Sequence, residues 1–518
     1  MERNGRRQLI ICLFSFMSVP AWQAAMAFDL PTDPAQTLAR RAIDAMGGQK
    51  ALGGIQSLRL TAHAYRRMLE QSERPEGPWI PSFTYVTQWI GFDGSRIRTK
   101  ITYPHWKYSV TTTAMGAKGV RKLIVGTEKE KITPARRRDL RQLIRRVALG
   151  PERVLFAALA ANDLHTEPLT YLQDVPHRVL AFTWGDAPVR IFLNAHTLLP
   201  TAVEITRPLP YDVFWNLWGD VTTRIYFSSW TLRGGGLRYP QQWDIWRNDQ
   251  PYRTVYIDQL DMDATPPSDN VPISEAQLTA FPKEGTVDEI HLAGEVQELA
   301  PGVVLLPGSW NSTLVAQSDG VVIIEAPISS GYSAAVLTEV ASRFPDRPVK
   351  AVVTTSDAWP HVGGIREYVS RGTPLYLLDL NVPFIKAVLR APHRMRPDAL
   401  ARHPQTPRLH VVSGRAVIGE GANRIELYPV RGESGERMML VYFPQYRLLY
   451  ASDLVQFNLD GSFAFPEYLS EVARVVAQEG LQVERVFAMH TPHAVPWQTI
   501  KAAIARAVMP VSADIEGR

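Results

Sequence analysis

Alternation of apolar and polar residues dominates the first half of the chain. Stretches in which every second residue is apolar recur along it, separated by turn residues such as the three glycines at 234–236. A period of two predicts strands that bury one face and expose the other, so we expect a β-rich domain here. The predicted strands cover residues 58–64, 96–102, 189–193, 203–207, 222–231 and 242–247.

Three helical stretches interrupt these predicted strands. The first starts near Pro34, with Asp33 as its N-cap, and ends at Gly47-Gly48. The second begins at Thr133-Pro134 and the third follows Gly150-Pro151. Their apolar positions fall on one side of each helix, which indicates that the helices pack on the sheet.

The pattern changes in the second half of the chain. Short β-branched runs there alternate with helical stretches, which predicts a layered domain of strands and helices. The runs cover residues 303–306, 321–325, 352–355, 375–378, 440–443 and 483–489, and the helical stretches cover 331–343, 365–371 and 468–479.

A segment rich in Pro, Ser and Asp separates the two patterns and indicates a linker at residues 265–290. The chain is therefore predicted to be an α+β protein of two domains with separate cores. A β-rich N-terminal domain would cover residues 28–264, and a second domain would cover residues 291–508.

The first 27 residues have the features of a secretory signal peptide. Arg3, Arg6 and Arg7 precede a short apolar run at 9–17, and small residues at 25–27 offer a cleavage site. The apolar run is far shorter than the roughly 20 residues of a membrane-spanning helix. We therefore expect a cleaved signal and a periplasmic or secreted protein, with the general and twin-arginine export routes both open.

Composition narrows the chemistry. The 518 residues carry a formal charge of only +5 and 21% charged residues, which argues against nucleic acid or an anionic surface as a partner. No later segment approaches the length of a transmembrane span, so stable membrane insertion is not expected. The single cysteine, Cys12, lies within the predicted signal. A mature chain would therefore have no disulfide, no cysteine-ligated zinc and no thiol nucleophile.

Polar residues end several apolar strands of the second half. Glu325 follows one predicted strand, Asp357 and His361 follow the next, Asp453 follows a third and His490 follows the last. Loops at strand ends are where a layered domain of this class gathers its functional groups.

These stretches, in this order, resemble the metallo-β-lactamase superfamily over roughly residues 295–505. The resemblance includes Asn311-Ser312, His361 followed by two glycines at 363–364, the turn at 432–435 and Ser452-Asp453. It implies a four-layered αββα sandwich with a metal site at one edge and, in most members, zinc-dependent hydrolysis.

The resemblance also implies which ligands survive. The family's His-x-His-x-Asp-His motif falls on Ser356, Ala358, Pro360 and His361, so that only His361 matches, and Glu433 stands where relatives place a further histidine. Its bridging aspartate and last histidine match Asp453 and His490.

We therefore expect one divalent metal, most plausibly zinc, held by His361, Asp453 and His490. Glu433 and Asp357 are the candidate catalytic carboxylates, as oxygen ligands or as a general base. A site without metal, in which the three matching residues only form hydrogen bonds, is the alternative.

Neighbouring residues leave further alternatives. Trp359 is expected either to wall the pocket beside His361 or to pack in the core. His493 is a rival for the role of His490. Three other histidines are predicted to lie at the surface: His393, His403 and His410.

The first half resembles, more weakly, the periplasmic lipoprotein-carrier fold, in which a curved antiparallel sheet cups apolar ligands. The resemblance lies in a helix that ends in Gly-Gly, the following Leu-x-x-Ile-x-Ser-Leu and the strand-rich sequence up to Pro240. Two functions follow for the whole chain: an exported hydrolase with a remodelled, mononuclear metal site, or a non-catalytic periplasmic binding protein for an apolar or envelope ligand. In both cases the partner is a small-molecule or lipid-like ligand.

Overall fold

The computed structural model describes residues 34–508, except 94–95, 116–117, 127–128, 268–284 and 459–460. The predicted signal peptide at 1–27, the predicted N-cap Asp33 and most of the predicted linker lie outside the described residues. Within the described part of the chain, no helix is both long enough and apolar enough to span a bilayer.

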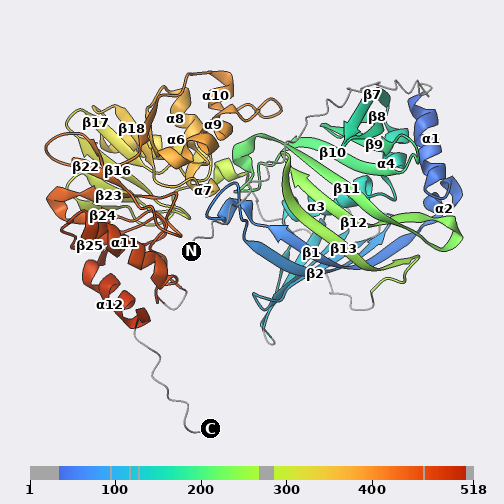
Figure 1. Ribbon diagram of the computed structural model, residues 1–518, viewed down its shortest axis with the longest axis horizontal. Helices are drawn as coiled ribbons and strands as arrows, with labels where there is room; N and C mark the ends of the chain where they lie inside the picture. The colour runs from blue at the N-terminus through green and yellow to red at the C-terminus, as the bar shows by residue number, and fades with distance from the viewer. Residues whose placement is uncertain are drawn as a thin grey trace, which may run out of the picture.

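The first half forms one 13-stranded sheet in which every neighbouring pair is antiparallel (Figure 1). Its spatial order is β6-β5-β4-β3-β2-β1-β13-β12-β11-β10-β9-β8-β7. The strands are β1 (Ser57–Arg67), β2 (Pro81–Gly91), β3 (Ile97–Tyr103), β4 (Tyr108–Met115), β5 (Lys118–Val125), β6 (Lys129–Pro134), β7 (His165–Leu172), β8 (Val175–Trp184), β9 (Ala187–Asn194), β10 (Pro200–Pro208), β11 (Asp220–Leu232), β12 (Arg238–Arg247) and β13 (Gln250–Met262).

Four helices belong to this half: α1 (Ala35–Ala45), α2 (Gln49–Gly54), α3 (Arg137–Leu149) and α4 (Val154–Ala160). The sheet curves around α3 and α4, with α1 and α2 near one end (Figure 1). Residues of α1, α2 and α4 form a hydrophobic core with inward-facing residues of β1 and β8–β13. Trp243 is buried in this core and Trp230 packs against it, so these aromatic residues fill the interior rather than line an open ligand cup.

The second half contains a 7-stranded and a 6-stranded sheet. The first has β14 (Gln297–Ala300), β15 (Val303–Leu306), β16 (Ser312–Gln317), β17 (Gly320–Ile324), β18 (Val349–Thr354), β19 (Leu375–Leu378) and β20 (Leu409–Val412) in that order, and its last four strands are parallel. The second has β21 (Ala416–Ile418), β22 (Ile425–Pro429), β23 (Met439–Phe443), β24 (Leu448–Tyr450), β25 (Arg485–Phe487) and β26 (Val495–Pro496), with β24 and β25 parallel.

These two sheets pack face to face with helices on both outer faces. Residues of both sheets form the hydrophobic cluster between them. The outer face of the 7-stranded sheet is covered by α6 (Ser330–Arg343), α7 (Trp359–Val362), α8 (Ile365–Ser370), α9 (Val382–Arg390) and α10 (Ala399–Arg402). The outer face of the 6-stranded sheet is covered by α11 (Pro466–Gln478) and α12 (Trp497–Val508). The α+β class is confirmed, and the layer order is helix, sheet, sheet, helix.

Each half has a hydrophobic cluster of its own, and a further cluster, not expected from the sequence, is shared by the two halves. One hydrophobic cluster joins Trp215 and Trp218 of the first half to residues of the second. The Trp359 ring lies 4.8 Å from that of Trp215 and 5.3 Å from that of Trp218, and Phe384 closes the group. Trp359 stacks on Phe384 and the other pairs meet edge to face, and together these rings bury apolar area that neither half covers alone.

Candidate metal centre

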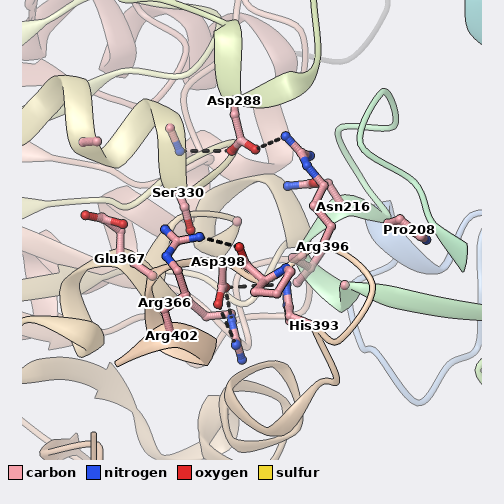
Figure 2. A pocket seen from close by; sticks show the side chains of 17 residues that line it. Pro208, Asn216, Asp288, Ser330, Arg366, Glu367, His393, Arg396, Asp398 and Arg402 are labelled. Atoms are coloured by element: carbon pink, nitrogen blue, oxygen red, sulfur yellow. Dashed lines mark hydrogen bonds and ion pairs between the residues drawn. The ribbon is translucent and has the colours of Figure 1, made fainter. Parts of the chain in front are cut away.

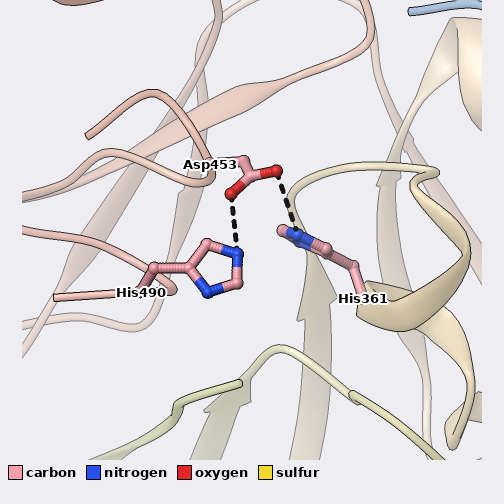
Figure 3. Close-up of side chains that lie close together, drawn as sticks. All are labelled: His361, Asp453 and His490. Carbon is pink, nitrogen blue, oxygen red and sulfur yellow. Dashed lines mark ion pairs between the residues drawn. The ribbon is translucent and has the colours of Figure 1, made fainter. Parts of the chain in front are cut away.

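The three predicted metal ligands come from separate segments that meet at one edge of the sandwich (Figure 3). His361 lies on α7, which follows β18, and Asp453 and His490 follow the parallel strands β24 and β25. Parallel strands bring their carboxyl ends to the same edge of a sheet, and this topology explains the convergence. The Asn311 amide holds the His490 loop by donating hydrogen bonds to the carbonyls of Ala488 and Thr491.

The geometry of the three side chains suits a single ion. One ligand atom from each residue lies within 4.8 Å of the others. Nε2 of His490 is 2.9 Å from Oδ1 of Asp453, and Nε2 of His361 is 3.7 Å from Oδ2. Two ligands about 2.1 Å from a tetrahedral zinc ion lie about 3.4 Å apart, so an ion fits among these atoms after small side-chain movements.

His361 supplies an independent indication of a bound group. Its side chain is buried, and neither ring nitrogen has a hydrogen-bond partner among the described residues. A buried polar atom without a partner costs roughly 1–3 kcal/mol. An ion coordinated by Nε2 would remove part of this cost, and two imidazoles with one carboxylate are a donor set that zinc accepts.

The electrostatics of the group favour a cation. Burial lowers the pKa of His361, but the nearby carboxylates of Asp453 and Glu325 outweigh this effect and raise the pKa to about 10. Burial raises the pKa of Asp453, yet the two imidazoles hold it well below its usual range. The ionised carboxylate therefore attracts a proton to the neighbouring ring, and a divalent ion would compete for the same place.

Glu325 is a buried neighbour of this group to which the sequence assigned no role. It directly follows β17 with a φ of 73°, a left-handed conformation that is rare outside glycine. Its Oε1 accepts a hydrogen bond of 3.0 Å from the Tyr450 hydroxyl and another from Thr355, and its Oε2 lies 3.8 Å from Nδ1 of His361. The sequence does contain a sign of this role: Glu325 directly follows an all-apolar strand, and a carboxylate at such a buried position is uncommon unless it is paired.

Asp357 lies in the wall of the cavity that contains the metal ligands. Its carboxyl is buried, and this burial raises its pKa to about 7 while Arg437 opposes the shift. Nη1 of Arg437 is 3.4 Å from Oδ2 of Asp357, and Nη2 is 2.8 Å from Oε2 of Glu76, which belongs to the first half. A carboxyl that titrates near neutral pH can both accept and release a proton.

Glu433 does not join the group. It is exposed and is not among the residues that line the cavity. The inner side of its turn is filled by the Glu471 carboxylate, which accepts hydrogen bonds of 2.8 Å from the backbone N–H groups of Ser434 and Gly435. A Cβ at Gly432 would lie 1.9 Å from Oε2 of Glu471, so the turn leaves no inward room for a ligand side chain.

The remaining sequence alternatives are resolved by burial. Trp359 packs in the core between the two halves and does not wall the cavity. His493 is exposed and lies outside the group, while His403 and His410 are exposed as expected. The expectation for His393 was wrong: its side chain is 8% exposed and Nδ1 lies 3.5 Å from Asp398. The segment after α9 is pressed against Gly219 of the first half, which encloses this ring.

A second cavity, of about 380 Å³, also lies between the two halves (Figure 2). Its charged side chains are engaged with one another: Arg366 forms a two-pronged pair with Asp398, with Nη2 3.0 Å from Oδ1, and Arg396 lies 2.9 Å from Asp288. These pairs join structural elements, and no metal-ligand group of the described residues lies there. Of the two cavities, the one lined by His361 is therefore the one whose described residues can hold a metal ion.

The known proteins that resemble this chain are solved structures with low sequence identity to it. No protein-family model matches the chain, and no curated protein matches it. Among solved structures, a metallo-β-lactamase from Pontibacter korlensis is 17% identical over 41% of this chain and 97% of its own, with a TM-score of 0.32. One from Erythrobacter litoralis is 17% identical over 42% and 98%, with a TM-score of 0.31.

A stereoselective inverting sec-alkylsulfatase from Pseudomonas sp. is similar at 14% identity, over 40% of each chain, with a TM-score of 0.30. These structural neighbours include metallo-β-lactamase-fold proteins. Structural similarity at these TM-scores says nothing about the activity of this chain. The activity has to be inferred from the side chains of the site.

Proposed function

We propose that this protein is an exported hydrolase that depends on one divalent metal ion, zinc most plausibly, held by His361, Asp453 and His490. The observation that supports it best is His361, which is buried with both ring nitrogens unbonded while Nε2 faces Asp453 and the second imidazole. Export rests on the basic and apolar pattern of residues 1–27. The proposed units are residues 28–264 and 291–508.

A zinc ion in this donor set would lower the pKa of a bound water and polarise the bond under attack. The chain itself supplies orientation and proton transfer. Burial restricts the His361 ring beside Glu325. Asp357, which lines the same cavity and whose pKa burial raises to about 7, would take a proton from water and return it to the leaving group. In the hydrolysis, the bond from the acyl carbon to the leaving atom breaks, and water contributes its oxygen to the carbon and a proton to the leaving atom.

Glu433 has no part in this proposal because it is exposed outside the cavity. The alternative remains a binding protein that uses the same cavity without catalysis. This alternative is favoured by Ser356, Ala358 and Pro360, which stand at positions where the resemblance implies metal ligands.

Metal content decides between the two functions. The purified protein, dialysed against zinc, should hold one ion per chain by elemental analysis, and zinc should raise its melting temperature. His490→Asn and His361→Asn should lose the ion, whereas Glu433→Gln should keep it. Because His490 is partly exposed, its variant tests the ligand set even if the His361 variant folds poorly. A chain that binds no divalent metal, or that binds two tightly, contradicts the proposal.

A further inference from the structure

The cavity that contains the candidate metal ligands is lined by residues of both halves of the chain. It has a volume of about 450 Å³, within the range of small-molecule sites. His361, Asp453 and His490 lie among its lining residues. The first half contributes the segment between β1 and β2, with Met68 and Ile80. Any substrate that reaches the three ligands therefore also contacts the first half.

Exposed apolar side chains line this cavity. Ile80, Trp106 and Phe465 come from three distant segments, are 44%, 59% and 40% exposed, and all line the cavity. Scattered exposed apolar residues are ordinary, but several that converge on one cavity mark a ligand surface.

Further aromatic rings line the cavity and are held in place by stacking. The Phe465 ring stacks on Tyr468 at 4.9 Å, and the Trp310 ring lies edge-on to His490 at 6.1 Å. Because these rings have neighbours that order them, an apolar group can bind against them with little loss of side-chain freedom.

Away from the metal ligands, the charges of the cavity disfavour an anionic group on the ligand. Among the described residues that line it there is one arginine and no lysine. That arginine, Arg437, is already engaged by Asp357, by Glu76 and by the carbonyl of Leu380 at 2.6 Å. Glu73 and Asp453 add negative charge to the lining. A carboxylate, sulfate or phosphate carried on the part of the ligand that lies away from the metal ligands would lose its hydration without gaining a free arginine or lysine of the lining.

We propose that this cavity takes neutral substrates with an apolar acyl or aryl group. This group binds against the aromatic rings of Trp106, Trp310 and Phe465, and the scissile ester or amide bond is directed at the metal ligands. The proposal rests on the hydrolase function proposed above and names its substrate class. Hydrolysis of such an ester consumes one water and releases a carboxylic acid and an alcohol, so no other reactant is required. Esters and amides that carry a carboxylate beside the apolar group are disfavoured as substrates, because the lining offers that second charge no free arginine or lysine.

Two fluorescent probes of closely similar shape test the ligand class without catalysis. N-phenyl-1-naphthylamine is neutral, and 1-anilinonaphthalene-8-sulfonate adds one sulfonate to the same ring system. The neutral probe should bind the purified protein at least tenfold more tightly. Trp106→Ala should weaken it about tenfold, whereas Phe83→Ala, which removes an equally exposed ring outside the cavity, should leave it unchanged.

Glu76→Gln gives a charge-specific control. It should free Arg437 from one of its two carboxylates and improve binding of the sulfonate probe several-fold, with little effect on the neutral probe. Tighter binding of the sulfonate to the parent protein, or neutral-probe binding that ignores Trp106→Ala, overturns the proposal.

Hydrolysis separates the failure of this proposal from the failure of the proposed function. The zinc-loaded protein should hydrolyse p-nitrophenyl hexanoate in preference to p-nitrophenyl phosphate or p-nitrophenyl sulfate. Selective binding of the neutral probe without hydrolysis of any of the three would overturn the hydrolase and leave the ligand class supported. Preferential hydrolysis of the phosphate or the sulfate would support a hydrolase and overturn the substrate class.

Discussion

The Glu325 carboxylate lies 3.8 Å from Nδ1 of His361, and both side chains are enclosed by the sandwich. The Tyr450 hydroxyl, at 3.0 Å, holds the other oxygen of the carboxylate. This arrangement places a fixed negative charge behind the imidazole whose Nε2 faces Asp453. Such a partner orients a metal-binding histidine and raises the basicity of the nitrogen that binds the ion.

Replacing Glu325 by glutamine should therefore weaken zinc binding. The amide keeps the size of the side chain and can still accept from Tyr450, but it removes the charge. We expect a tenfold to hundredfold loss of affinity in calorimetric titrations with zinc. Glu426→Gln is the matched control, because Glu426 is also buried and also accepts a tyrosine hydroxyl, that of Tyr428, away from the site. Equal zinc affinities for both variants would show that Glu325 is structural only.

Asp357 should make the stability of the metal-free protein depend on pH. Burial raises its pKa in the folded protein to about 7, above the usual aspartate value of 3.8, so the folded state binds the proton more tightly than the unfolded state. The free energy of unfolding should therefore fall as the pH rises from about 4 to about 7 and remain reduced above that.

Asp357→Asn removes this titration. The variant should be more stable than the parent at pH 8, on the order of 2 kcal/mol, and the difference should shrink towards pH 4. Urea unfolding of EDTA-treated protein at both pH values provides the measurement. A variant that is less stable than the parent at pH 8 and gains relative stability only in acid would reverse the sign and refute the assignment.

The Arg366–Asp398 pair should matter far more than surface ion pairs. Both side chains are largely buried, and Arg366 also donates to the carbonyl of Leu389 at 2.7 Å. Asp398→Asn would leave a buried guanidinium without its counter-charge, so we expect a loss of about 3–5 kcal/mol in the free energy of unfolding. Glu339→Gln, which breaks the exposed pair with Arg343, should cost no more than about 0.5 kcal/mol. Similar costs for the two variants would contradict the burial argument.

The tryptophan cluster should hold the two halves together even after the chain is cut. Insertion of a specific protease site within residues 268–284 should yield two fragments that still elute together in gel filtration, because Trp215, Trp218 and Trp359 pack across the contact. Adding Trp359→Ala should separate them, since truncating a buried tryptophan costs about 3–5 kcal/mol. Trp243→Ala, in the core of the first half alone, should destabilise that fragment without releasing its partner. Fragments that separate without any substitution would show that the cluster contributes little.

The local pattern of apolar and polar residues was enough to predict many helices and strands and to identify three residues of the candidate site. The predicted strands at 303–306 and 375–378 coincide with β15 and β19, because short β-branched runs between turns have few other conformations. The sequence also marked His361, Asp453 and His490, since polar residues at the ends of apolar strands converge wherever parallel strands share an edge.

Other features depended on contacts between segments far apart in the chain. The helix predicted to start at Thr133-Pro134 starts at Arg137, because β6 continues through Pro134 in its pairing with β5. Glu433 stays outside the site because Glu471, from α11, fills its turn, and His393 is buried because the first half covers it.

Sequence alone therefore determined the type of most elements and the residues at the strand ends, since both depend on near neighbours in the chain. The tertiary structure decided the shared tryptophan core, the position of Glu325 behind His361 and the engagement of Arg437 by Glu76 and Asp357. Burial and pairing between distant segments have no signature in local periodicity, because they depend on which surfaces the folded chain brings into contact.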